Sequence, residues 1–142
     1  MNSLVIDATS TKIFLVIINS KNIYTSTHEN SKSNFDKLTI FINDFLKNNE
    51  ISINKIDQIY VNRGPGSFAG IRNSLSIVKG IHLSRNIDYF CFSYFDFLDK
   101  KPKNIKYFLK KNVIKTPKWK DIPNLCNKYK IKKNLIKPLY VS

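Results

Sequence analysis

Residues 59–84 constrain the fold most strongly, because an apolar run, a glycine-rich turn and an amphipathic helix follow one another there without a gap. The turn contains Gly64-Pro65-Gly66, in which the proline ring fixes φ while both glycines can take positive φ values. We therefore expect a rigid, sharp reversal that leads from a strand at residues 59–62 into a helix at about residues 71–84. The turn is either a structural elbow or a ligand contact.

The turn does not match either common nucleotide-binding loop. Three residues separate Gly66 from Gly70, where the dinucleotide-binding fingerprint has two. A Walker-type loop needs a Lys-Ser/Thr pair after its last glycine, and Ile71-Arg72 stands there instead. The spacing therefore supports neither nucleotide motif.

The rest of the first hundred residues predicts further strands and a second helix. Apolar runs at residues 4–6, 13–18 and 23–25, separated by turn residues, predict an antiparallel opening, and residues 13–18, apolar on both faces, predict an interior strand. A helix is expected from Ser33 to about residue 48, where Ser33 and Asp36 resemble a capping box, and a strand at residues 89–93. The apolar residues of that helix are Phe35, Leu38, Phe41, Ile42, Phe45 and Leu46.

The turn also carries a family resemblance. Residues 62–72 resemble the signature of the TsaB (YeaZ-type) family, usually written GRGPGSFTGLR, with Asn62, Ala69 and Ile71 as departures. Residues 4–10 are similar to the family's opening strand, which ends in Asp-Thr-Ser, and residues 78–81 to its Ala-Lys-Gly-Leu stretch. The signature residues present are Arg63, Gly64, Pro65, Gly66, Ser67, Phe68, Gly70 and Arg72.

This resemblance covers residues 4–98 and implies an α/β fold, an actin-like (ribonuclease H-like) mixed sheet with flanking helices. Typical members carry a second lobe of similar size, whereas 43 residues follow position 99 here. We expect a domain at residues 1–99 and a reduced, lysine-rich remnant of the second lobe at residues 100–142. Residues 137–141 resemble the family's Pro-x-Tyr close, which suggests an internally shortened protein. Asn34-Phe35-Asp36 replaces the family's His-Ser-Glu.

The resemblance further implies a non-catalytic scaffold of the complex that forms N6-threonylcarbamoyladenosine in tRNA. Such a subunit pairs through helices with a catalytic TsaD-type paralogue and works with a TsaE-type ATPase; it can form a homodimer when alone. The apolar arc of the helix at residues 71–84 spans roughly 160°, wider than the ~100° stripe that covers a sheet. This favours a partner surface, although the two helices packing on each other would explain it too. The expected partner-binding residues are Ile40, Ile71, Leu75, Lys79, His82 and Leu83.

The charge is concentrated at the end of the chain. The formal net charge is +14, and residues 100–142 hold 14 Lys+Arg against one acid, Asp121. This segment could contact tRNA phosphates. Alternatively, its lysines could reflect the compositional bias of the sequence, and its aromatic residues could form a small core. The lysines proposed for tRNA contact are Lys110, Lys111, Lys118, Lys120, Lys132 and Lys133.

Catalytic and metal-binding groups are few. Asp7 at the end of the first strand is either a turn cap or the acid that actin-like relatives use with metal-bound phosphate. Cys91 and Cys126 read as buried thiols, and His28 and His82 complete no catalytic set or metal site. We therefore expect no catalytic residues, cofactor or metal.

The alternatives are an ATP-binding actin-like enzyme, which would need a fuller second lobe, and a stand-alone basic RNA-binding protein. No membrane-length apolar stretch is present, so a cytoplasmic protein is expected.

Overall fold

The structure is a computed structural model that describes residues 1–34 and 36–141. Its centre is a five-stranded sheet in the order β3-β2-β1-β4-β5. β1, β2 and β3 pair antiparallel, and β4 and β5 continue the sheet from β1 in parallel. The mixed sheet and the expected order of elements are therefore confirmed. The strands are β1 Ser3–Asp7, β2 Lys12–Ile18, β3 Ile23–Glu29, β4 Gln58–Asn62 and β5 Asp88–Phe92.

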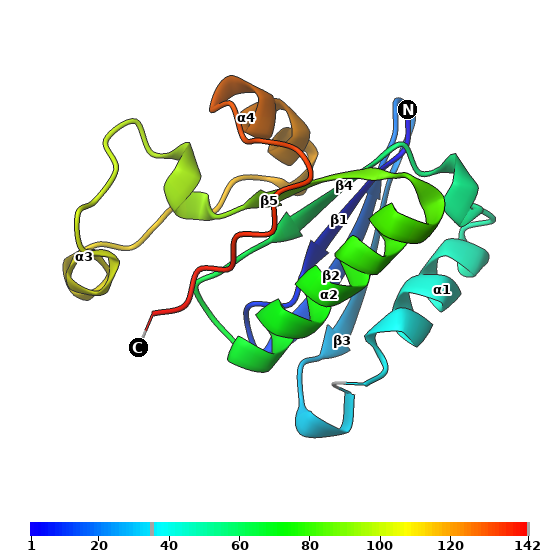
Figure 1. Ribbon diagram of the computed structural model, residues 1–142, viewed down its shortest axis with the longest axis horizontal. Helices are drawn as coiled ribbons and strands as arrows, with labels where there is room; N and C mark the ends of the chain where they lie inside the picture. Colours follow the sequence, from blue (N-terminus) through cyan, green and yellow to red (C-terminus); the bar gives the residue numbers. More distant parts are fainter. Residues whose placement is uncertain (35, 142) are drawn as a thin grey trace.

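Two helices cover one face of the sheet and pack side by side (Figure 1). They are α1 Leu38–Asn48 and α2 Phe68–Arg85. Their buried residues meet Leu4 and Ile6 of β1, which alternate with Val5 on the opposite face. The remaining helices and 3-10 turns are η1 Lys32–Asn34, η2 Ile53–Lys55, η3 Tyr94–Phe97, α3 Ile105–Lys111, η4 Trp119–Asp121 and α4 Ile122–Lys128.

The lysine-rich tail covers the other face of the sheet. Ile122 and Cys126 of α4 are buried against Val5, Val16 and Phe92. Strands that are apolar on both faces need cover on both faces, and burying a side chain such as Ile122 stabilises the fold by about 1.5–3 kcal/mol. The short apolar patches of the tail thus complete the core of the sheet.

The first helix begins later than the sequence predicted. Its N-cap is Lys37, whose side chain makes no capping hydrogen bond, so the expected capping box of Ser33 and Asp36 is wrong. Ser33 lies in the preceding 3-10 turn, where its hydroxyl pairs with that of Ser31 at 3.0 Å. Phe35, which we expected on this helix, lies outside the described residues.

The second helix begins earlier than predicted, at Phe68. Ser67 is its N-cap, and the Ser67 hydroxyl accepts a hydrogen bond from the Gly70 N–H at 3.1 Å. The helix ends at Arg85, after which Asn86 takes a left-handed conformation with φ 56°. The turn between β4 and α2 therefore ends at Ser67, before the last glycine of the signature, which lies in the first turn of the helix.

The end of the chain returns along β5, the edge strand (Figure 1). Lys133 forms an antiparallel bridge with Phe90, and the Asn134 N–H donates to the Tyr89 carbonyl at 2.7 Å. Further on, the Leu139 N–H donates to the Arg63 carbonyl at 2.8 Å. This covers backbone groups that an open edge strand would expose.

Within residues 1–34 and 36–141, no helix is both long and apolar enough to cross a membrane. The described chain also contains no group of three or more His, Cys, Asp and Glu side chains placed to hold a metal ion. Both cysteines are free and buried, as expected.

Candidate functional site at the signature loop

Asp7 joins three elements at the carboxyl ends of the parallel strands, and only 5% of it is exposed. Its Oδ1 accepts hydrogen bonds from the Thr9 N–H at 3.0 Å and the Thr9 hydroxyl at 2.6 Å. Its Oδ2 accepts from the Asn62 amide at 3.0 Å and the Tyr94 hydroxyl at 3.1 Å. A carboxylate offers about four acceptor positions, so these donors occupy Asp7 within the fold.

Tyr94 is a neutral donor in this network. Burial and the neighbouring Asp7 carboxylate raise the pKa of the Tyr94 hydroxyl well above its ordinary value of 10.0. The hydroxyl therefore keeps its proton at physiological pH and donates it to Asp7. The network therefore fixes the Asp7 side chain between β1, β4 and the turn after β5.

The glycines of the signature loop allow close contact with the backbone of the β1–β2 turn. A Cβ on Gly66 would lie 2.1 Å from the Thr9 carbonyl oxygen, and a Cβ on Gly70 would lie 1.9 Å from that of Ala8. The Ser67 N–H donates to the Thr9 carbonyl at 2.8 Å. Only residues without a side chain permit this approach, as is typical of a structural elbow.

Several backbone donors of the loop are also used within the protein. The Gly64 N–H donates to the Asn62 side chain at 2.9 Å, and the Gly70 N–H donates to the Ser67 hydroxyl at 3.1 Å. A phosphate-binding loop instead presents such N–H groups to its ligand. The geometry therefore favours the structural elbow over the ligand contact.

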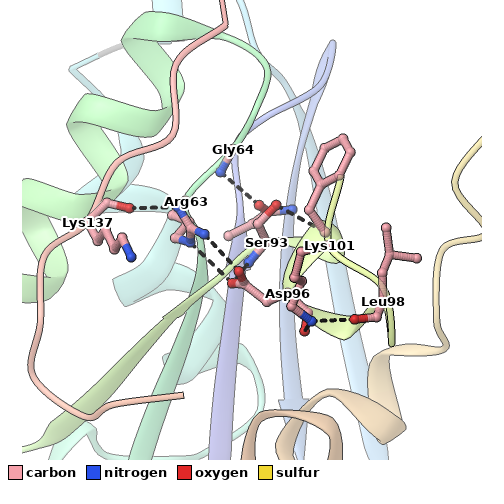
Figure 2. A network of polar contacts seen from close by, with 9 residues as sticks. Arg63, Gly64, Ser93, Asp96, Leu98, Lys101 and Lys137 are labelled. Carbon is pink, nitrogen blue, oxygen red and sulfur yellow. Dashed lines mark hydrogen bonds and ion pairs between the residues drawn. The ribbon is translucent and has the colours of Figure 1, made fainter. Parts of the chain in front are cut away.

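Arg63 ties the loop to the turn after β5 and to the end of the chain (Figure 2). Its guanidinium donates two hydrogen bonds to the Asp96 carboxylate, at 2.8 and 3.2 Å, and a longer one to the Lys137 carbonyl at 3.4 Å. Asp96 also accepts from the Ser93 N–H at 2.8 Å and belongs to a capping box with Ser93. The fork-shaped pairing fixes both side chains, which are only 11% and 19% exposed.

Two cavities lie beside Tyr94. One, of about 450 Å³, is bordered by Asp7, Phe14 and Trp119, and the other, of about 380 Å³, by Pro65 and Leu109. Neither lining contains a histidine or cysteine among the described residues. The arrangement offers binding space beside the Asp7 network.

The outer sides of α1 and α2 form a second candidate surface. A groove of about 160 Å³ lies between the helices and is bordered by Ile42, Ile77 and Ile81. On the same two helices, Ile40 and Leu83 are 55% and 74% exposed. The groove lining also includes the polar residues Thr39, Asn43, Ser84 and Arg85, and Ile40 and Leu83 add exposed apolar side chains elsewhere on the same two helices.

A family model described as TsaD, tRNA N6-adenosine threonylcarbamoyltransferase, matches residues 20–96, more than half of the chain. A TsaB protein, "tRNA threonylcarbamoyladenosine biosynthesis protein TsaB", from Buchnera aphidicola subsp. Baizongia pistaciae is 37% identical over 71 residues, which cover 44% of this chain and 32% of that protein. The TsaB protein from subsp. Schizaphis graminum is 29% identical over 98 residues, covering 69% and 47%. The chain belongs to the TsaB (YeaZ-type) branch of this family.

Solved TsaB-type structures share its fold. YeaZ from Pseudomonas aeruginosa superposes with a TM-score of 0.61 at 18% identity, over 68% of this chain and 46% of that one. The actin-like α/β fold expected from the sequence is therefore confirmed. The matched part of the chain spans less than half the length of these relatives.

The structure places the TsaB signature residues in different environments. Arg63 and Gly64 contact the end of the chain, while Gly66 and Gly70 contact the β1–β2 turn. Phe68 remains 59% exposed, with its ring 4.7 Å from that of Tyr140 and 5.7 Å from the Arg72 guanidinium. The signature thus serves mainly as a junction between segments that are distant in the sequence.

The six expected partner-binding residues separate into three groups. Ile71 and Leu75 are buried in the core and support α2 from beneath, so neither can contact a partner in this arrangement. The His82 ring bonds the Ile87 carbonyl at 2.9 Å and closes the end of the helix. Ile40, Lys79 and Leu83 face outward on the two helices.

The expected tRNA-contacting lysines are spread over the tail. Lys110 and Lys111 end α3, Lys118 and Lys120 flank Trp119, and all four are exposed. Lys133 instead forms an ion pair with Asp88 at 3.7 Å, while its neighbour Lys132 borders a cavity. The six lysines therefore lie on three separate segments of the tail, at the end of α3, around Trp119 and beside β5.

Sequence reasoning missed Asn62, Tyr94 and Asp96 as members of the Asp7 and Arg63 networks. The Ser-x-x-Asp spacing of Ser93 and Asp96 is a capping-box signal that could have located the turn after β5. No local pattern indicates that Tyr94 reaches Asp7, because 87 positions separate them.

Proposed function

We propose that this chain is an accessory, non-catalytic subunit in the formation of N6-threonylcarbamoyladenosine in tRNA. Its TsaB relatives are named for the biosynthesis of this nucleoside. Its own role would be to pair with a TsaD-type catalytic paralogue, with a TsaE-type ATPase completing the assembly in the cytoplasm.

The apolar outer surface of α1 and α2 carries this proposal. Leu83 exposes 74% of its surface and Ile40 exposes 55%, on the two helices that border the apolar groove. Scattered exposed apolar residues are common, but here they lie on helices that border a groove lined by four isoleucines together with Thr39, Asn43, Ser84 and Arg85, a combination that suits helix-to-helix docking. The same surface would account for a homodimer when the partner is absent.

The Asp7 network supports a non-catalytic role. An actin-like enzyme would use this carboxylate for metal-bound phosphate, whereas here Thr9, Asn62 and Tyr94 supply four hydrogen bonds to it. Recruiting Asp7 for catalysis would require breaking these buried contacts, each worth about 1 kcal/mol or more. The arrangement therefore disfavours the alternative of an ATP-using enzyme.

The lysine-rich segment at residues 100–142 would take the place of the family's second lobe and contact tRNA in the assembled complex. Lys110, Lys111, Lys118 and Lys120 are exposed and next to exposed or half-buried aromatics such as Tyr107 and Trp119. Replacing these four lysines with glutamine should weaken tRNA retention by the complex and flatten its salt dependence. Unchanged retention over a range of salt concentrations would remove the tail from the proposal.

The decisive experiment is depletion of this protein in its own cell, followed by mass analysis of tRNA nucleosides. Threonylcarbamoyladenosine should fall and should be restored by the intact chain. A Leu83→Asp variant should fold but fail to restore it or to co-purify with the TsaD-type paralogue.

Ile23→Asp is the matched control, because Ile23 is 46% exposed and lies on β3, outside α1, α2 and the lysine-rich tail. It makes the same chemical change without touching the proposed interface. An unchanged nucleoside level after depletion would refute the function, and full activity of Leu83→Asp would refute the interface.

A further inference from the structure

A cavity of about 270 Å³ lies between β5, the turn that follows it and the segment at residues 130–137. Its charged lining consists of Arg63, Asp96, Lys130, Lys132 and Lys137. The rest of the lining is apolar or uncharged, comprising Cys91, Ile131 and Leu135. None of these residues belongs to α1 or α2, so the cavity is separate from the surface proposed for the partner.

The charges around this cavity do not balance. Arg63 and Asp96 neutralise each other through their paired contact at 2.8 Å. Lys130, Lys132 and Lys137 form no ion pair with any carboxylate of residues 1–34 or 36–141, whereas the adjacent Lys133 does pair, with Asp88. Three like charges around one hollow repel each other, and an anion between them would relieve that repulsion.

The segment that carries the lysines is anchored along its length. The Ile131 N–H donates to the Cys126 carbonyl at 2.9 Å, and Asn134 pairs with Tyr89 through both its backbone and its side chain. At the far end, the Lys137 carbonyl accepts from Arg63, as Figure 2 shows. The lysines therefore project from a backbone that is already positioned, which lowers the entropic cost of binding.

The rest of the lining adds no unpaired negative charge that would repel an anion. Burial raises the pKa of the Cys91 thiol to about 11, so this group is uncharged at physiological pH. The Asp96 carboxylate, which could repel an anion, is already occupied by Arg63 and the Ser93 N–H. The cavity thus presents excess positive charge against a partly apolar wall.

We propose that this cavity binds a phosphate group, with the ammonium groups of Lys130, Lys132 and Lys137 as its charged donors. A phosphate group, whether a free anion or a singly charged RNA phosphodiester, presents several acceptor oxygens that can meet more than one ammonium group, and lysine ammonium groups bind phosphate as compact point charges. The phosphate comes either from free phosphate in solution or from the backbone of an RNA.

The test compares two variants of the full chain that lose the same charge. Lys132→Gln/Lys137→Gln removes two cavity lysines, and Lys103→Gln/Lys106→Gln removes two exposed lysines outside the cavity. Calorimetry at low ionic strength would measure binding of inorganic phosphate and, separately, of a single-stranded oligoribonucleotide without terminal phosphates. Because exposed charge pairs contribute about 0.2–1 kcal/mol each, losing two of the three cations should weaken binding about tenfold in the cavity variant and much less in the control.

The two probes distinguish the source of the phosphate. Weaker binding of inorganic phosphate alone would identify a free-phosphate site. Weaker binding of the oligoribonucleotide, relative to the control variant, would identify an RNA backbone contact. Equal affinities of the two variants for both probes would overturn the proposal, because the attraction would then reflect only the overall charge of the tail.

Discussion

Two glycines of α2 provide a matched test of the contact between this helix and the β1–β2 turn. Gly70 and Gly80 lie in the same helix, so replacing either by alanine can gain up to about 1 kcal/mol of helix stability. A Cβ at Gly80 would meet no atom within 4 Å, whereas a Cβ at Gly70 would lie 1.9 Å from the Ala8 carbonyl oxygen. The two substitutions are chemically identical but meet opposite surroundings.

At Gly70, the steric cost of the added Cβ should exceed the gain in helix stability from alanine. The atom in the way belongs to the backbone, so the clash can be relieved only by moving the turn that also holds Thr9 against Asp7 and Ser67. Overpacking of this kind costs about 1–3 kcal/mol, and occasionally more. We expect Gly80→Ala to stabilise the chain by about 1 kcal/mol and Gly70→Ala to destabilise it by about 2 kcal/mol.

Urea unfolding of the isolated chain would measure the change in the free energy of unfolding for each variant. In thermal unfolding, the midpoint temperature should move by about 4 °C for each kcal/mol. The slope of the transition should be the same for both variants, because neither changes the surface exposed on unfolding. If Gly70→Ala proved as stabilising as Gly80→Ala, the close approach of α2 to the β1–β2 turn would not exist in solution.

Two further predictions concern the second face of the sheet and the buried thiols. Ile122→Ala should lower the free energy of unfolding in urea by about 3 kcal/mol, because it removes a fully buried side chain. The control Val113→Ala changes an exposed side chain and should have little effect. Equal effects of the two substitutions would mean that α4 does not pack on the sheet. Burial raises the pKa of Cys91 and Cys126 from 9.0 to about 11 and about 12, so the unfolded chain loses these protons first as the pH rises. The free energy of unfolding should therefore be constant below about pH 9 and should decline toward pH 11–12. The decline should be smaller in Cys126→Ala, and an identical pH dependence in that variant would contradict a raised pKa for Cys126.

Local patterns predicted the first hundred residues well. The alternating and continuous apolar runs located all five strands, and β2 is interior as its two apolar faces indicated. Element boundaries were less accurate, since Ser67 was not recognised as the cap of α2 and Ser33 was wrongly taken as that of α1. Serine favours caps and turns alike, so its role depends on whether the backbone that follows is helical.

The candidate site was only partly predictable. The signature loop and the exposed positions Ile40 and Leu83 could be selected from the sequence, but the same helical arc also included Ile71 and Leu75, which are buried. Helical periodicity gives the angular position of each side chain around the helix. When the apolar arc is wide, periodicity does not tell which of its residues face the sheet and which face solvent.

The sequence by itself determined the order of strands and helices, the rigid turn at Gly64-Pro65-Gly66 and the concentration of positive charge after residue 99, because each depends on neighbouring residues. The tertiary structure alone decided that the tail covers the second face of the sheet, that Arg63 meets Asp96, and that Lys132 borders a cavity while Lys133 pairs with Asp88. Arg63 and the Lys137 carbonyl are 74 positions apart in the chain. Contacts at that separation form only when the whole chain packs, so no local periodicity encodes them.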